Sequence, residues 1–132
     1  MPGKLSLTLS VLPQTFAICR LEKNTPIPDW ALRGSQFSSI TASSEEISIV
    51  CDESVVPPDV KAVKGWRAFK VEGPLDLSMT GVVASLTSPL AEAGISVFTL
   101  STYDTDYLLV NTGRLEDAIM VLSQFCEVTF RV

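Results

Sequence analysis

The order of strand and helix patterns in the second half of the chain constrains the fold more than any other feature. Residues 66–73, "WRAFKVEG", are typical of a strand, and residues 79–94 place apolar side chains at helical spacing. Residues 98–110 predict a hairpin, residues 114–126 a second amphipathic helix, and residues 127–132 a last strand. The order is therefore strand, helix, strand, strand, helix, strand.

This order predicts an α+β fold of the ferredoxin-like βαββαβ type, with a four-stranded antiparallel sheet and both helices on one face. The helix ends carry the expected signals. Ser78 or Thr80 can cap the first helix, and Gly94 takes the position after its last turn. Glu116 and Asp117 stand in the first turn of the second helix, where negative side chains favour the helix dipole.

The first half of the chain has the pattern of a shortened copy of the same fold. Residues 5–12 alternate apolar and hydroxyl side chains, residues 16–21 predict a second strand, and residues 37–52 predict a hairpin. Pro57-Pro58 lies in the segment that follows, residues 53–65, and allows neither a helix interior nor a central strand. We therefore expect a connector where the second helix of a complete copy would stand.

A local internal repeat supports this division. A shift of sixty positions aligns residues 39–41 with residues 99–101, and residues 49–50 with residues 109–110, without a gap. We predict two tandem copies, a degenerate N-terminal one in residues 1–62 and a complete one in residues 63–132. Two unrelated hairpins that merely share β-propensity are the alternative explanation.

Composition excludes several classes of function. The chain has 132 residues, a net charge of −5 and only ten scattered basic residues, which argues against nucleic-acid binding. It has no histidine, which excludes Ser-His-Asp and Cys-His mechanisms. Cys19, Cys51 and Cys126 form no CxxC pair and are typical of buried thiols. No apolar run approaches the length of a membrane span. We expect a cytoplasmic protein that binds no metal, cofactor, nucleic acid or membrane.

The tip of the second hairpin is unusual for its residue types. The segment "STYDTD", residues 101–106, contains two carboxylates and several hydroxyl groups but no glycine, whereas tight hairpin turns favour Asn-Gly or Asp-Gly. Asp and Ser side chains at turns commonly bond to their own backbone, which is one explanation. The other is a polar rim that holds a small ligand.

Three features together resemble the ACT domain. They are Gly73-Pro74 before the first helix, "PLAEAGISVF" at residues 89–98, and "STYDTDYLLV" at residues 101–110. More narrowly, residues 66–122 are similar to tandem ACT-like proteins related to the cytosolic arginine sensor of animals. The resemblance implies a non-catalytic regulatory module that binds an amino acid and forms a homodimer. The segment "EGPLDLSMTG" departs from the Asp-Arg-Pro-Gly loop of the most familiar members.

The predicted fold brings the loop after Gly73 beside residues 99–106. Backbone N–H groups at the start of the helix that begins near Met79 could receive a ligand carboxylate, and Asp106 or Asp76 could bind its ammonium group. The resemblance implies Thr102, Tyr103 and Asp106 as ligand contacts on the strand. The candidate ligand-binding set is Gly73, Leu75, Asp76, Leu77, Ser78, Ser101, Thr102, Tyr103 and Asp106.

Two other functions compete with ligand binding. The chain could be a structural dimerisation module that pairs sheet edges without a ligand. It could also be an enzyme that uses Asp104 and Asp106 as a carboxylate pair or a Mg²⁺ site, but a DxD pair alone is a weak motif.

Overall fold

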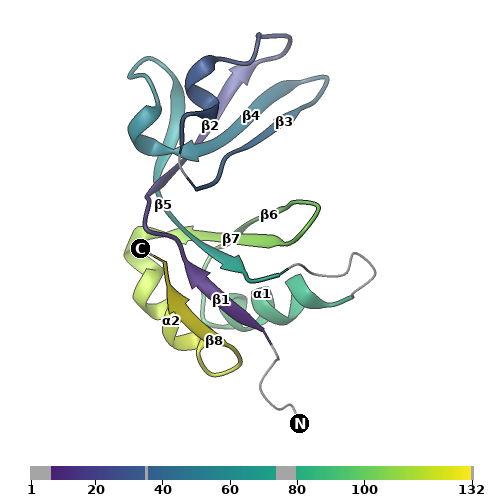
Figure 1. Cartoon of the computed structure of the whole chain (residues 1–132), viewed down its shortest axis with the longest axis vertical. Coiled ribbons are helices and arrows are strands. Elements are labelled where there is room, and N and C mark those ends of the chain that lie inside the picture. Colours follow the sequence, from purple (N-terminus) through teal and green to yellow (C-terminus); the bar gives the residue numbers. More distant parts are fainter. Residues whose placement is uncertain (1–6, 35, 74–79, 132) are drawn as a thin grey trace. The chain divides into compact units, whose positions relative to one another are not determined.

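The computed structural model describes residues 7–34, 36–73 and 80–131, and the chain divides into two compact units (Figure 1). Unit 1 comprises residues 1–13 and 67–132, and unit 2 comprises residues 14–66. Unit 2 is thus an insertion within unit 1. This division differs from the predicted boundary between residues 62 and 63, because the first strand belongs to unit 1. Alternation in residues 5–12 identifies a strand but does not identify its partners.

Unit 1 contains a sheet with the strand order β6-β7-β5-β1-β8. The bounds are β1 Thr8–Val11, β5 Lys61–Val71, β6 Phe98–Ser101, β7 Asp106–Asn111 and β8 Glu127–Phe130. Strand β1 pairs antiparallel with β5 and parallel with β8. The prediction of a four-stranded, purely antiparallel sheet was therefore wrong, because the N-terminal strand lies between β5 and β8.

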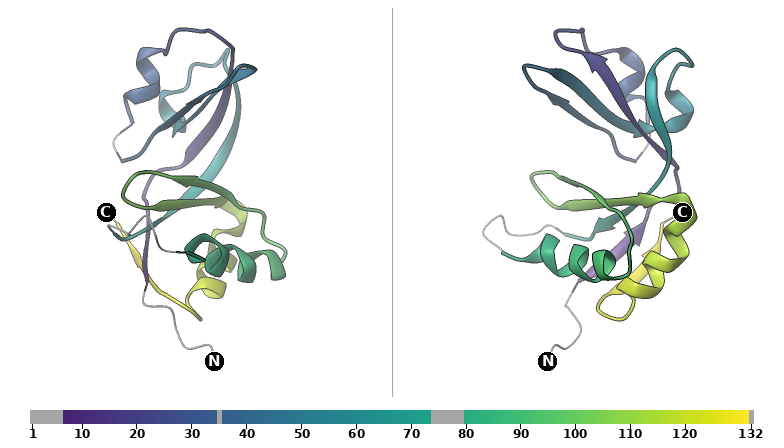
Figure 2. Two further views of the ribbon diagram at one scale, coloured as in Figure 1. Left: turned by 90° about the vertical axis from the view of Figure 1, so that its right-hand side faces the viewer. Right: turned by 180° about the vertical axis from the view of Figure 1, so that it is seen from behind.

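Two helices cover one face of this sheet, as the βαββαβ order predicted (Figure 2). Helix α1 spans Val82–Glu92 and helix α2 spans Leu115–Leu122, directly after the 3-10 turn η3, Thr112–Arg114. Alternate residues of the central strands point at these helices. The shared core of strands and helices contains Leu9, Val11, Phe69, Val71, Leu86, Leu90, Leu108, Val110, Ala118 and Leu122.

The ends of α1 agree only in part with the predicted signals. The residue before the helix is Gly81, with φ of 78°, and not Thr80, while Ser78 lies outside the described residues. At the other end Gly94 has φ of 75°, and the Ile95 N–H donates to the Leu90 carbonyl at 2.9 Å. This is the glycine-terminated helix end that the sequence predicted.

Unit 2 contains a sheet with the order β3-β4-β2-β5, formed with the first part of β5. Its strands β2 Phe16–Glu22, β3 Ser39–Ala42 and β4 Glu46–Asp52 confirm the predicted strand and hairpin. The 3-10 helices η1 Asp29–Leu32 and η2 Glu53–Val55 flank them. The connector prediction was wrong beyond the prolines, because β5 already begins at Lys61. Pro57-Pro58 lies outside any helix or strand, but β5 starts three residues after Pro58.

The hairpins of the two units share their turn chemistry but not the predicted offset. In unit 2, Ser43 and Glu46 close the turn, and the Glu46 N–H donates to Ser43 Oγ at 3.2 Å. In unit 1 the equivalent pair is Thr102 and Thr105, with the Thr105 N–H donating to Thr102 Oγ1 at 3.2 Å. The turns therefore match at an offset of 59 residues and not sixty. A common origin of the two hairpins stays a prediction.

Candidate functional site

The β6–β7 turn is closed by a threonine side chain instead of a glycine. The Thr102 N–H donates to the Thr105 carbonyl at 2.8 Å, and Thr102 Oγ1 accepts the Thr105 N–H. Tyr103 and Asp104 form the tip between them. Among the described residues Asn24 alone combines a side chain with positive φ, so neither tip residue needs the left-handed region. The hydroxyl group of Thr102 thus replaces the usual Asn-Gly geometry.

Thr105 fixes this turn against the end of β5. Its hydroxyl group donates to the Val71 carbonyl, and the residue is only 5% exposed. Val71 is the last residue of β5, and Gly73 follows two positions later. The turn and the start of the loop after β5 are therefore held side by side.

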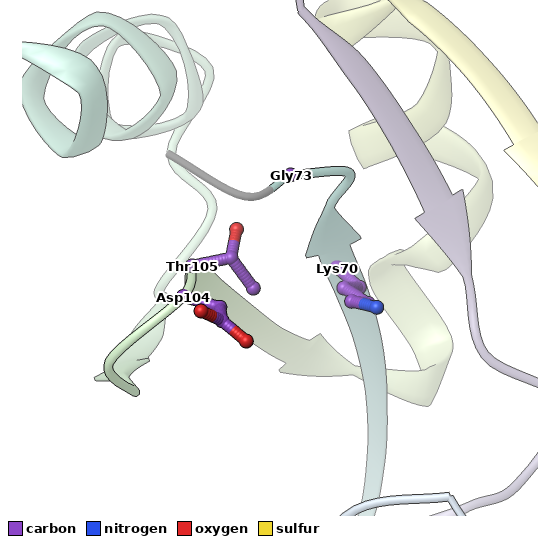
Figure 3. A pocket seen from close by; sticks show the side chains of 4 residues that line it. All are labelled: Lys70, Gly73, Asp104 and Thr105. Atoms are coloured by element: carbon purple, nitrogen blue, oxygen red, sulfur yellow. The ribbon is translucent and has the colours of Figure 1, made fainter. Parts of the chain in front are cut away.

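A small cleft of about 200 Å³ lies at this junction (Figure 3). Its described lining residues are Lys70, Gly73, Asp104 and Thr105, from β5, the loop after it and the hairpin turn. Pockets for drug-sized ligands typically measure about 300–1,000 Å³, so this cleft suits a smaller molecule. The expectation that Gly73 faces the hairpin agrees with this geometry.

The cleft presents two opposite charges that are not paired with each other. The Lys70 side chain is 24% exposed, and its nearest ion pair is with Glu72, at 3.9 Å. The Asp104 carboxylate projects from the turn toward β5 (Figure 3), and it makes no hydrogen bond or ion pair to any described residue. Both groups therefore have hydrogen-bonding capacity left for a small molecule.

Glu72 connects Lys70 to the rest of the outer face of the sheet, opposite the helices. Glu72 accepts hydrogen bonds from Ser10 Oγ and from one Arg131 nitrogen, which contacts its two carboxylate oxygens at 3.1 and 3.0 Å. The Ser10 hydrogen bond and then Arg131 and Lys70 lower the pKa of the Glu72 carboxyl, against the effect of burial. Burial raises the pKa of the neighbouring Tyr107 hydroxyl, and Arg131 opposes that effect.

The structure separates the sequence-predicted residues into groups. Gly73 lines the cleft. Asp106 accepts a hydrogen bond from Ser101 Oγ at 2.5 Å across the strand pair, Thr102 closes the turn, and Tyr103 is 82% exposed. These four residues are not among the described lining residues. The candidates Leu75, Asp76, Leu77 and Ser78 lie outside the described residues.

Sequence reasoning did not select three of the lining residues, Lys70, Asp104 and Thr105. A signal for Lys70 was available, because alternation along residues 66–73 places it on the face opposite Phe69 and Val71. For Asp104 the sequence suggests a role only as half of a carboxylate pair with Asp106. No residue pattern distinguishes it from Asp106 without the exact position of the turn.

Three further findings concern metal ligands, helix hydropathy and the cysteines in the described part of the chain. Within residues 7–34, 36–73 and 80–131 no group of three His, Cys, Asp or Glu side chains could hold a metal ion. Over the same residues, no helix has the length and apolar character to cross a membrane. Cys19, Cys51 and Cys126 are buried free thiols, as the sequence indicated.

Comparison with known proteins identifies the family. The model of the ACT domain matches residues 61–124. Residues 61–124 belong to the ACT domain family. A second family model, for an N-terminal domain, matches residues 14–59, which lie within unit 2.

One relative and two solved structures are similar to this chain. Cytosolic arginine sensor for mTORC1 subunit 1 from Bos taurus is 31% identical over 100 residues, covering 67% of this chain. The chain spans only 30% of that relative's length. Protein Atu0741 from Agobacterium tumefaciens is 37% identical, with 97% of this chain and 96% of that chain covered and a TM-score of 0.89. Aspartate kinase from Clostridium acetobutylicum shares the fold alone, at 11% identity, with a TM-score of 0.67 over 95% of this chain and 36% of that chain.

Proposed function

We propose that this chain is a non-catalytic, cytosolic regulatory module that binds a free amino acid in the cleft between Lys70 and Asp104. The decisive observation is that two opposite charges, which are not paired with each other, line one small cleft. A free amino acid carries a carboxylate and an ammonium group, and both need partners when water is removed. Lys70 would bind the carboxylate and Asp104 the ammonium group.

The ACT family and the arginine sensor among the relatives support the ligand class. Charge-assisted hydrogen bonds of this kind contribute about 1.5–3 kcal/mol each. Thr105 would form part of the cleft wall, and Gly73, which has no side chain, would let the ligand approach the backbone closely. The proposed role is recognition, with no bond made or broken.

A thermal-shift screen with the twenty amino acids at millimolar concentration tests this proposal. A ligand that binds only the folded chain raises the free energy of unfolding by RT ln(1 + [L]/Kd), and the melting temperature rises with it. We expect Asp104→Asn and Lys70→Met each to weaken binding about ten- to hundredfold. L-arginine comes first because the bovine relative is named for it.

Two matched substitutions serve as controls. Asp106→Asn makes the same chemical change on the same hairpin, at a carboxylate bonded to Ser101, and Asp59→Asn makes it at an exposed turn in unit 2. Both variants should bind like the unmodified chain. Loss of binding in Asp106→Asn with normal binding in Asp104→Asn would move the site away from the cleft. A screen in which no amino acid raises the melting temperature would overturn the proposed function.

Self-association is a second candidate function, supported by the edge of the unit 1 sheet. Strand β8 ends the strand order, and Phe130 on it is 64% exposed. An edge strand with an exposed aromatic side chain favours pairing with another chain. We expect a homodimer in light scattering and a shift to monomer in Phe130→Ser. A wild-type chain that stays monomeric at high micromolar concentration would exclude this candidate.

A further inference from the structure

We propose that Lys70 is shared between Glu72 and the carboxylate of a bound amino acid, so that Glu72 and Arg131 set the affinity of the cleft. This inference rests on the proposed function and concerns its regulation. Neither Glu72 nor Arg131 is a described lining residue of the cleft. They act through the amino group of Lys70.

The first observation is that Lys70 is only loosely held. Its amino group lies 3.9 Å from Glu72, beyond the 2.7–3.2 Å of a normal N–H···O hydrogen bond. Glu72 is already engaged by Ser10 and by Arg131 at 3.0 and 3.1 Å. The Lys70 amino group can therefore leave Glu72 without breaking a hydrogen bond.

The second observation is the position of Lys70. Its side chain lines the cleft, yet Figure 3 shows its amino group turned away from Asp104. The flexible four-carbon stem of lysine allows the amino group to rotate toward a ligand. Binding would thus move the Lys70 charge from the side of Glu72 to the cleft.

Glu72 and Arg131 should act on this movement in opposite directions. The Glu72 carboxylate attracts the Lys70 amino group, so it competes with the ligand carboxylate for that group. Arg131 neutralises Glu72 and thereby weakens that competition. Removal of the Glu72 charge frees Lys70, whereas removal of Arg131 leaves Glu72 with Lys70 as its remaining cationic partner among the described residues.

Calorimetric titration of Glu72→Gln and Arg131→Gln tests the inference with L-arginine, or with whichever amino acid gives the largest shift in the screen. We expect about two- to fivefold tighter binding in Glu72→Gln and about two- to fivefold weaker binding in Arg131→Gln. The amide of the same amino acid, which lacks the carboxylate, should bind no tighter to Glu72→Gln. In a Lys70→Met background both effects should vanish, as a double-mutant cycle requires.

The outcomes separate this inference from the proposed function. Structural damage would weaken binding in both variants, so opposite signs require the shared lysine. Equal affinities, or weakening in both variants with unchanged melting temperatures of the unliganded chains, would overturn the inference while wild-type binding still supports the function. Persistence of either effect in the Lys70→Met background would also overturn it. If no amino acid binds the wild-type chain, the function and the inference fail together.

Discussion

At the scale of single residues, the hydroxyl groups of the hairpin tip are explained by the fold and the carboxylate of Asp104 is not. Thr102 closes its turn in the same way as Ser43 closes the turn of unit 2. Thr105 bonds to Val71 and Ser101 bonds to Asp106. The simple explanation from turn chemistry thus accounts for most of the polar tip, and Asp104 carries the case for a ligand.

Thr105→Val should destabilise unit 1. The substitution keeps the shape of the side chain but leaves the buried Val71 carbonyl without the hydroxyl donor, at a cost of about 1–3 kcal/mol. Urea unfolding monitored by circular dichroism measures the change. Thr105→Ser retains the hydroxyl group and should recover most of the lost stability. Equal stability of Thr105→Val and the wild-type chain would show that the hydrogen bond contributes little.

The sequence could predict the hairpin but not which of its aspartates lines the cleft. Alternation places Asp104 and Asp106 near a turn, yet it does not give the exact position of the turn, so it leaves open which carboxylate bonds within the hairpin. The Thr102–Thr105 closure decides the matter, and a side-chain hydrogen bond of this kind has no periodic signal. The loop candidates from Leu75 to Ser78 stay predictions.

At the scale of elements, local patterns predicted strands and helices well, while pairing depended on distant residues. The periodicity of residues 82–92 and 115–122 is a local property, and both helices form there. The partners of β1 lie some sixty and more than a hundred positions away in sequence. Such long-range pairing cannot be read from alternation, which explains the error in sheet order.

The buried thiols of Cys19 in β2 and Cys51 in β4 predict how the stability of the chain depends on pH. Burial raises the pKa of Cys51 from 9.0 to about 12, and the nearby Cys19 adds to the effect. Below pH 9 both states keep the thiol protonated, whereas between pH 9 and 12 only the unfolded chain ionises, so stability falls as pH rises. The free energy of unfolding should fall by up to about 1.4 kcal/mol per pH unit for this thiol.

Urea unfolding between about pH 8 and about pH 11, a range that includes the ordinary pKa of a thiol, measures this slope. The Cys51→Ala variant, although less stable at every pH, should lose stability less steeply above pH 9 than the wild-type chain. An identical slope in the two chains would show that Cys51 does not titrate differently in the folded and unfolded states.

At the scale of the whole molecule, the insertion of unit 2 makes unit 1 discontinuous in sequence. The Leu12 N–H donates to the Ala68 carbonyl at 2.9 Å, so the two ends of the interrupted unit meet on adjacent antiparallel strands. A short turn could therefore replace all of residues 14–66. The predicted division at residue 62 would instead remove β1 and with it the core residues Leu9 and Val11.

A fusion of residues 1–13 to residues 67–132 through an Asn-Gly turn should fold and unfold cooperatively. Residues 63–132 alone should not, because β8 loses its partner β1 and the core loses two fully buried side chains. Circular dichroism with urea titration compares the two chains. A stable, cooperatively unfolding fragment 63–132 would contradict the assignment of β1 to unit 1.

The position of β1 in the sheet also determines when this strand can pair during translation. The ribosome releases β1 before its neighbours, because the part of β5 that pairs with β1 follows unit 2 and β8 follows helix α2. Unit 2 can complete its own sheet once the first part of β5 has left the exit tunnel. Strand β1 must wait, with its apolar side chains uncovered, until both helices and β8 have been translated.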